Sequence, residues 1–228
     1  MGDDADADRG EAWDFVALDP DSRLVLGVVV GKRVGETAVA LLEDVKPRFG
    51  GRTPELVTSD EWPAYPEAIR EVFGHEVTPE PTGRPGRPAE PRVEVPAGLN
   101  YATVHKTRVN GRVVEVATRL VMGLWAALTS LLGGSKVNTS YVERQNATDR
   151  HRNARKGRKT YRFSKAFEAH EAMTHFTMYG YNYCWPVRTL RQEVGPRRYR
   201  QRTPAMAAGL TDHVWSLREW LAFPACQP

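Results

Sequence analysis

Hydrophobic and polar positions along the first third of the chain predict alternating strands and helices. Their spacing predicts, in order, strands over 13–18 and 24–30, a helix over 36–45, a strand over 55–59 and a helix over 66–73. The first two strands flank Asp19-Pro20-Asp21-Ser22, which is typical of a turn because proline presets φ and the short polar side chains bond to nearby amides. This order of elements is an α/β pattern.

The remaining two thirds begin with a Pro-rich stretch, 76–98, that holds six prolines and three glycines and predicts a loop without regular structure. Beyond it, two β-branched runs flank Asn110-Gly111, a strong hairpin signal. The pattern then predicts strands over 101–109 and 113–121, helices over 123–132, 140–158 and 165–183, and a short amphipathic segment over 213–223. The stretch between Pro186 and that segment is basic and predicted to be irregular.

Length and composition fit one soluble domain with appendages. The 228 residues, 41% of them hydrophobic, suffice for a core. The pattern predicts a disordered acidic lead-in over 1–11, an α/β domain over 12–185 and a basic C-terminal tail with a short helix over 186–228. Two distant cysteines fit a reducing compartment, and neither a bilayer-spanning run nor a signal peptide is visible. We therefore expect a cytoplasmic protein with no membrane partner.

The net charge of +4 conceals an asymmetry along the chain. Residues 1–143 carry 16 bases and 22 acids, whereas residues 144–228 carry 16 bases and 6 acids. A cationic segment of this kind favours a polyanionic partner such as nucleic acid, although a solvated basic face is the plainer interpretation.

The basic charge is densest over 144–165, where nine Lys or Arg residues accompany one acid, Asp149. Cations that neutralise phosphates release counterions, so such a run supports strong, salt-dependent DNA binding, and Tyr161 and Phe163 offer stacking surfaces. The candidate DNA-binding residues are Arg144, Asn146, Arg150, Arg152, Arg155, Lys156, Arg158 and Lys159.

Two acidic residues are candidates for chemistry. Asp60 follows the predicted strand 55–59, and functional groups in open α/β sheets gather beyond the carboxyl ends of strands. Asp60 could instead be only a turn residue before Pro63. Glu143 shares a predicted helix face with Asn146 and Arg150, a placement that could hold a metal beside phosphate oxygens. Its spacing from Ser140 also fits a helix-capping pair.

Four runs of the sequence together resemble the catalytic region of bacterial insertion-sequence transposases of the IS-one type. They are WDFVALDPDSRLVLGVVVGKR, VTSDEWPAYPEAI, NTSYVERQNATDRHRNARKGRKTYRFSKA and RTPAMAAGLTDHVW, and the similarity covers most of residues 12–220. The resemblance implies a DDE transposase with a ribonuclease H-like α/β fold over 12–185, a mixed sheet flanked by helices. It also implies DNA partners, both transposon ends and target, in a bacterial nucleoid. In such enzymes three carboxylates hold two Mg²⁺ or Mn²⁺ ions, which stabilise the attacking and leaving oxygens of an in-line displacement at phosphorus.

The resemblance assigns two of the three carboxylates. Asp60 in VTSDEWPAY matches the family's second catalytic aspartate, and Glu143 in YVERQN matches its glutamate. Both are expected to be catalytic residues and metal ligands, with side chains within roughly 4 to 6 Å of each other. Glu61 departs from the family's usual Gly. The first catalytic aspartate belongs on a strand before the one that begins at Trp13, where this chain has only its acidic lead-in.

These departures shape the expected function. With two of three ligands we expect weak metal binding and little or no strand transfer from this chain alone, as in a truncated, mis-started or decayed transposase. A missing first strand also predicts an unpaired sheet edge and self-association into homo-oligomers. The alternative is a non-catalytic nucleic-acid-binding protein that uses the 144–165 segment. A ribonuclease H-like nuclease without transposition is chemically close to the first hypothesis.

Overall fold

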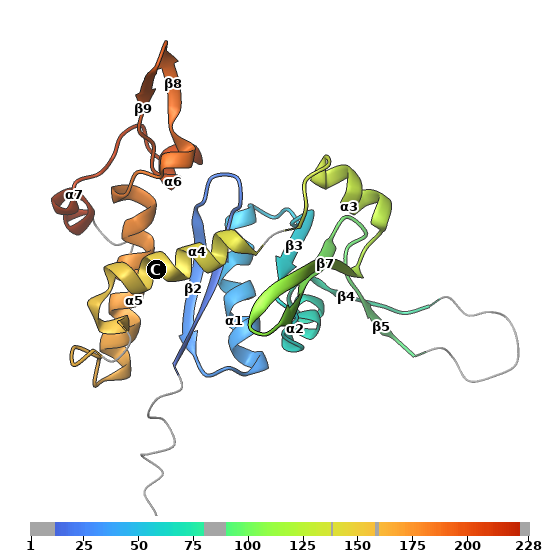
Figure 1. The fold of residues 1–228 in the computed structure, drawn as a ribbon. Helices are drawn as coiled ribbons and strands as arrows, with labels where there is room; N and C mark the ends of the chain where they lie inside the picture. Colours follow the sequence, from blue (N-terminus) through green and yellow to red (C-terminus); the bar gives the residue numbers. More distant parts are fainter. Residues whose placement is uncertain (1–11, 80–89, 138, 158–159, 224–228) are drawn as a thin grey trace, which may run out of the picture. The chain divides into compact units, whose positions relative to one another are not determined.

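The chain forms two compact units (Figure 1). The structure is a computed structural model and describes residues 12–79, 90–137, 139–157 and 160–223. Unit 1 comprises Met1–Lys32 with Ser140–Pro228, and unit 2 comprises Arg33–Thr139. Across the described residues there are seven α-helices and four small sheets. The chain is therefore a mixed α/β protein, as the hydrophobic pattern predicts.

Unit 1 opens with the predicted hairpin, in which β1 (Trp13–Leu18) pairs antiparallel with β2 (Val25–Gly31). The turn forms as its sequence predicts. The Asp19 carboxylate accepts hydrogen bonds from the amides of Asp21 and Ser22, at 3.3 and 3.0 Å. These bonds satisfy turn amides that have no strand partner.

The central helix of unit 1 is α5 (Phe167–Cys184), which contacts β2 and three helices. Val25 and Val28 of β2 pack in a buried cluster with Met178. The Asn182 side-chain amide donates to and accepts from the backbone of Val25, both at 2.9 Å. This buried amide fixes β2 against α5, because an amide with both groups bonded inside a protein is hard to displace.

The second half of unit 1 is more regular than its sequence suggests. The helix α4 (Ser140–Arg152) stops short of the predicted end at 158, and a 3₁₀ turn, η3 (Ala154–Lys156), follows Asn153. The later elements are η4 (Arg188–Leu190), β8 (Gln192–Gly195), β9 (Arg198–Arg200), α6 (Pro204–Ala207) and α7 (Leu217–Ala222). The prediction of an irregular stretch after Pro186 was wrong, because β8 and β9 pair antiparallel. Strands this short show no alternating pattern.

Unit 2 holds a mixed three-stranded sheet in the order β3-β6-β7. The strand β3 (Leu56–Ser59) runs parallel to β6 (Asn100–Val109), which pairs antiparallel with β7 (Arg112–Met122). Asn110 and Gly111 take φ values of 49° and 77°, which the Asn-Gly turn tolerates. The predicted hairpin is confirmed.

The helices of unit 2 bury apolar residues against one another and against the sheet. The helix α1 (Gly35–Val45), followed by η2 (Lys46–Phe49), packs against α2 (Ala64–Phe73). The helix α3 (Trp125–Leu132) places Leu128 in a buried cluster with Ala102 and Val104 of β6. The predicted helices over 36–45, 66–73 and 123–132 are therefore confirmed, with shifts of one or two residues at their ends.

The Pro-rich stretch contains regular structure at its borders. The strands β4 (His75–Val77) and β5 (Arg92–Glu94) pair antiparallel. The prediction of a loop throughout 76–98 was wrong there, because backbone pairing in a narrow ribbon needs no long apolar run. Residues 80–89 lie outside the described chain, as does the acidic lead-in 1–11.

The described strands are divided among a mixed three-stranded sheet and three two-stranded ribbons, and not joined in the single mixed sheet expected from the sequence. Among the described residues, β1 has β2 as its only strand partner and β3 has β6 as its only strand partner. None of the described helices combines the length and apolar character needed to cross a membrane.

Candidate functional site

Asp60 lies directly after β3 in unit 2, at the carboxyl end of a strand that runs parallel to its neighbour β6. Its side chain is exposed, and its Oδ1 accepts a 3.4 Å hydrogen bond from the Trp62 amide. The preceding Ser59 hydroxyl lies 2.6 Å from the Asp60 carbonyl oxygen and 2.7 Å from the Tyr101 hydroxyl. Asp60 is thus a turn residue and also stands at a strand end, so its position fits both interpretations of the sequence.

The surroundings of Asp60 are aromatic. Burial, and to a smaller extent the negative charge of Asp60, raise the pKa of Tyr65 to about 12. Burial also raises the pKa of Tyr101, against the opposing effect of the Ser59 hydroxyl. The Arg33 guanidinium stands 5.5 Å from the centre of the Trp62 ring. The charge of Asp60 thus acts on two phenols whose raised pKa values keep them neutral at ordinary pH.

Glu61, the residue that departs from the family pattern, turns to β6. Its Oε2 forms a short contact with Nδ1 of His105. Both side chains are well exposed, so this pair contributes little to stability. The contact gives the Glu61 carboxylate a partner other than a metal ion.

Glu143 lies in the first turn of α4 in unit 1 and is exposed. Ala147 and Arg150 are exposed with it, whereas Gln145 and Asp149 form the buried side of the helix. The predicted face of α4 thus lies at the surface. Asn146, which also belongs to the predicted face, is half-buried, and its Oδ1 has no hydrogen-bond partner among the described residues.

Lys156, a predicted DNA contact, instead forms the centre of a buried ionic cluster. Its Nζ lies 2.6 Å from Asp149 Oδ2 and 2.8 Å from Asp14 Oδ2, and its side chain is only 6% exposed. The Thr177 hydroxyl donates to Asp149 Oδ1 at 2.6 Å. His170 Nε2 stands 3.3 Å from Asp14 Oδ1 without hydrogen-bond geometry. The cluster ties β1, α4, η3 and α5 together. Asp149, the one acid in the basic run, was the sequence signal for this cluster.

Arg152 packs on an aromatic surface. Its guanidinium lies 3.7 Å from the centre of the Trp185 ring and 5.9 Å from that of Tyr181. Partial burial lowers the pKa of Arg152, although a guanidinium remains charged at any ordinary pH. Stacking of this kind holds the side chain in place and leaves its edge available for an anion.

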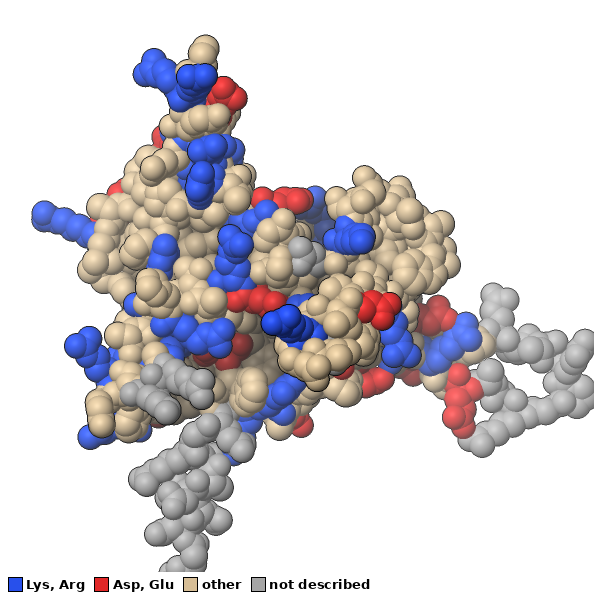
Figure 2. Space-filling view, viewed as in Figure 1, with Lys and Arg blue, Asp and Glu red and all other residues tan. Residues whose placement is uncertain are grey.

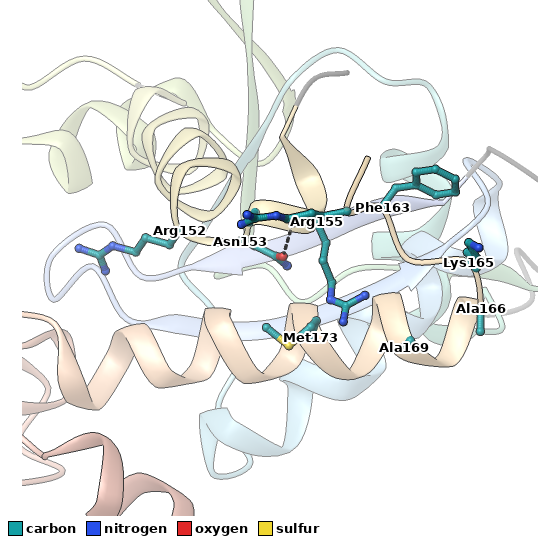
Figure 3. Close-up of a pocket in the computed structure, with 10 residues that line it drawn as sticks. Arg152, Asn153, Arg155, Phe163, Lys165, Ala166, Ala169 and Met173 are labelled. Atoms are coloured by element: carbon teal, nitrogen blue, oxygen red, sulfur yellow. Dashed lines mark hydrogen bonds between the residues drawn. The ribbon is translucent and has the colours of Figure 1, made fainter. Parts of the chain in front are cut away.

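A groove of about 770 Å³ opens beside these residues in unit 1 (Figure 3). The residues that line it come from the end of α4, from η3, from the segment 162–166 and from the first turns of α5. They are Arg152, Asn153, Ala154, Arg155, Arg162, Phe163, Lys165, Ala166, Ala169 and Met173. Four of them are cations and none is acidic. Arg162 and Lys165 belong to the basic run but are absent from the predicted contact set, and Asn153 carried no sequence signal. Phe163 was predicted only as a stacking surface.

The other described members of the predicted DNA-binding set lie at the surface of unit 1. Arg144, Arg150 and Arg155 are exposed, whereas Arg158 and Lys159 lie outside the described residues. Figure 2 shows further Lys and Arg side chains over the β8–β9 hairpin. The described cations thus extend well beyond α4.

The described carboxylates of unit 1 and those of unit 2 do not form a metal centre within their own unit. Asp60 belongs to unit 2 and Glu143 to unit 1. Among the described residues no group of three His, Cys, Asp or Glu side chains is placed to hold a metal ion. Carboxylates are the ligand type that Mg²⁺ and Mn²⁺ prefer, but the donor set for two ions is incomplete.

Comparisons of the chain with protein-family models, with curated proteins and with solved structures find no match.

Proposed function

We propose that this chain carries the catalytic region of a DDE-type transposase that acts on DNA ends during insertion-sequence transposition, with Asp60 and Glu143 as two of its three catalytic carboxylates. The proposal includes a ribonuclease H-like arrangement of the strands and an Mg²⁺ or Mn²⁺ site that uses Asp60 and Glu143. It rests on the motif resemblance together with the positions of these residues.

The order of elements supports the proposed fold. The chain runs β1, β2, α1, β3, α2 and returns through β6, which lies parallel to β3. A ribonuclease H-like sheet would need one more strand, bearing the first aspartate. The described chain is consistent with that requirement, because β1 and β3 each have a single strand partner.

One observation carries the functional proposal: the exposed face of α4 brings a carboxylate and cationic side chains together on one helix. Glu143 and Arg150 are both exposed on this helix, and the cationic groove begins at its last residue, Arg152. A carboxylate that holds a divalent ion needs cations nearby to hold the DNA backbone in register. The helix provides both within one element.

Manganese binding tests the proposal on the full chain, with Mn²⁺ titrated against the wild type, Asp60→Asn and Glu143→Gln and followed by electron paramagnetic resonance. Each substitution keeps the side-chain shape and removes one charged ligand, so each should weaken Mn²⁺ binding by about tenfold or more. Glu115→Gln in unit 2 and Glu168→Gln in unit 1 are exposed controls and should bind as the wild type does. Equal affinity in all five proteins would rule out a shared metal site.

Only two of the three catalytic carboxylates are assigned in this sequence, which allows a second test of catalysis. Incubation of this chain with end-sequence DNA and Mg²⁺ or Mn²⁺ should yield little or no cleavage and strand transfer. Strong cleavage that Asp60→Ala abolishes would show that the chain is a complete enzyme, and the inactive form would have to be abandoned.

A non-catalytic nucleic-acid-binding protein is the second candidate function, and the cationic groove favours it. Under this alternative the four groove cations bind DNA while Asp60 and Glu143 serve only local structure. DNA affinity would then be the same with Mg²⁺ as with EDTA at matched ionic strength, and both carboxylate variants would bind DNA as the wild type does.

A further inference from the structure

We propose that the groove in unit 1 binds one unpaired nucleotide of a single DNA strand, with its base against Phe163 and the apolar floor and its flanking phosphates on the cations at the rim. This inference rests on the proposal that the chain acts on DNA, and it names the form of DNA that this site takes. It uses neither Asp60 nor Glu143.

The groove combines the two surfaces that a nucleotide presents. Arg152, Arg155, Arg162 and Lys165 supply four positive charges, with no acidic residue among the lining side chains described. Proteins that hold single strands pair a cationic track for the backbone with aromatic faces for the bases. In Figure 3 the Arg155 side chain reaches toward α5, and Phe163 and Lys165 lie at the end of the groove opposite Arg152.

The floor of the groove is apolar. Ala166, Ala169 and Met173 of α5 and its N-cap line it, and the Phe163 side chain is 57% exposed. A base inside a duplex keeps its faces stacked on its neighbours and cannot reach such a floor. An unpaired base can leave the stack and bury its faces there, as bases do in enzymes that act on extruded nucleotides. The floor therefore selects a single strand.

Asn153 supplies an independent sign that a polar group belongs in the groove. The residue is 1% exposed, and its Oδ1 accepts the Arg155 amide at 3.1 Å. Its Nδ2 is buried and has no hydrogen-bond partner among the described residues. A buried donor left unpaired is costly, and such donors mark places that a ligand or water satisfies. A carbonyl or ring nitrogen of a base is an acceptor of the right kind.

The neighbouring aromatic residue provides a matched control. Tyr161 lies two residues before Phe163 in the same segment, is fully exposed, and does not line the groove. If bases merely adhered to any exposed ring of this basic segment, Tyr161 and Phe163 would contribute equally. If the groove is the site, only Phe163 contributes.

Fluorescence anisotropy of the full chain with a labelled dT₁₂ strand tests the inference. The wild type should bind dT₁₂ more tightly than a hairpin duplex of equal phosphate number. Phe163→Ala should weaken binding of dT₁₂ by about tenfold with an unchanged salt slope, whereas Tyr161→Ala should change it less than about twofold. Arg162→Gln should lower the salt slope by about 0.7, and Arg218→Gln on α7 should not.

One further variant and a competition experiment complete the test. Asn153→Asp preserves the acceptor that caps η3 but replaces the donor, so it should weaken dT₁₂ binding while the circular dichroism spectrum stays native. Free dTMP should compete only at concentrations far above the dT₁₂ dissociation constant. The inference is overturned if the duplex binds as tightly as dT₁₂, if Phe163→Ala and Tyr161→Ala behave alike, or if dTMP binds as well as the strand. Asp60→Asn should leave dT₁₂ binding intact, so failure of the metal site would be seen separately.

Discussion

At the scale of single residues, the basic run contains cations with different roles. Lys156 is buried between two carboxylates, whereas its neighbour Arg155 is exposed and lines the groove. A count of charges along the sequence treats the two alike, because it cannot tell which cation will meet an acid from another element. Asp14, the more distant partner, comes from the opposite end of the sequence.

Replacement of Lys156 by Met should destabilise unit 1. The change removes the ammonium group that compensates Asp149, whose side chain is only 2% exposed, and should lower the free energy of unfolding by about 3 kcal/mol. Urea denaturation of Lys156→Met and Arg155→Met measures the difference. The Arg155 variant should stay within about 0.5 kcal/mol of the wild type. Equal stability of the two variants would show that the buried cluster contributes nothing.

Tyr65 should make unit 2 sensitive to alkali. Its pKa rises from the ordinary value of 10 to about 12 in the folded chain, so between these pH values the unfolded chain loses a proton that the folded chain retains. The free energy of unfolding should therefore fall by about 2 kcal/mol as pH rises through this window. Tyr65→Phe should remove that part of the fall, as measured by denaturation at pH 9 to 11.5. The exposed control Tyr161→Phe should keep it, and identical slopes for both variants would contradict the assignment.

At the scale of elements, the local sequence pattern sufficed to predict structure where it contained a strong turn signal or a long run of periodic apolar residues. The hairpins at Asp19–Ser22 and at Asn110-Gly111, and the helices of unit 2, form where the sequence predicts them. The β4–β5 ribbon and the β8–β9 hairpin could not be predicted, because strands of three or four residues are too short for a period. The candidate site was predicted in part: Asp60 stands at a strand end and Glu143 at the surface of a helix. The groove could not be predicted, because its lining residues come from η3, the segment 162–166 and α5.

The start of β6 shows how one side chain can join several elements. The Asn100 side-chain amide donates to the carbonyl oxygen of Glu55, before β3, and its Oδ1 accepts the amide of Leu124, before α3. Gly123 makes this possible, since its φ is 93° and an added Cβ would lie 2.2 Å from Asn100 Oδ1. Only glycine fits there, for both conformational and steric reasons.

Gly123→Ala should therefore destabilise unit 2 more than an ordinary glycine substitution does. The matched control is Gly134→Ala, whose φ of 90° is similar but whose Cβ would meet open space. The control should cost about 1 to 2 kcal/mol of backbone strain, and Gly123→Ala about 2 kcal/mol more. Thermal and urea unfolding of the pair measure the difference, and equal losses would show that the Asn100 contact is dispensable.

The outer strand of the three-stranded sheet bears on self-association. Among the described strands β7 pairs only with β6, and its Val114 and Val116 side chains are exposed. A long edge strand with apolar side chains favours pairing between molecules. We expect concentration-dependent association in sedimentation velocity that Val116→Lys reduces. The control Leu221→Lys, on α7, should leave it unchanged. A chain that stays monomeric at high concentration would contradict this expectation.

At the scale of the whole molecule, the net charge belongs to one unit. Unit 2 has 13 bases and 13 acids, and unit 1 has 19 bases and 15 acids. The asymmetry along the sequence does not follow this division, because residues 1–32, with 3 bases and 8 acids, belong to unit 1 together with the basic residues beyond Thr139. Unit 1 holds the cationic groove, and the neutral unit 2 holds Asp60.

We propose that Asp60 and Glu143 serve one metal site, and a double-cysteine measurement tests this proposal most directly. Asp60→Cys and Glu143→Cys are introduced together into a Cys184→Ser, Cys226→Ser background, and a short bifunctional thiol reagent is added at low protein concentration. We predict an intramolecular cross-link in the monomer, identified by peptide mass, and none for the control pair Glu115→Cys and Glu143→Cys. Failure of the 60–143 pair to link, or linkage no faster than the control, would contradict a shared carboxylate site.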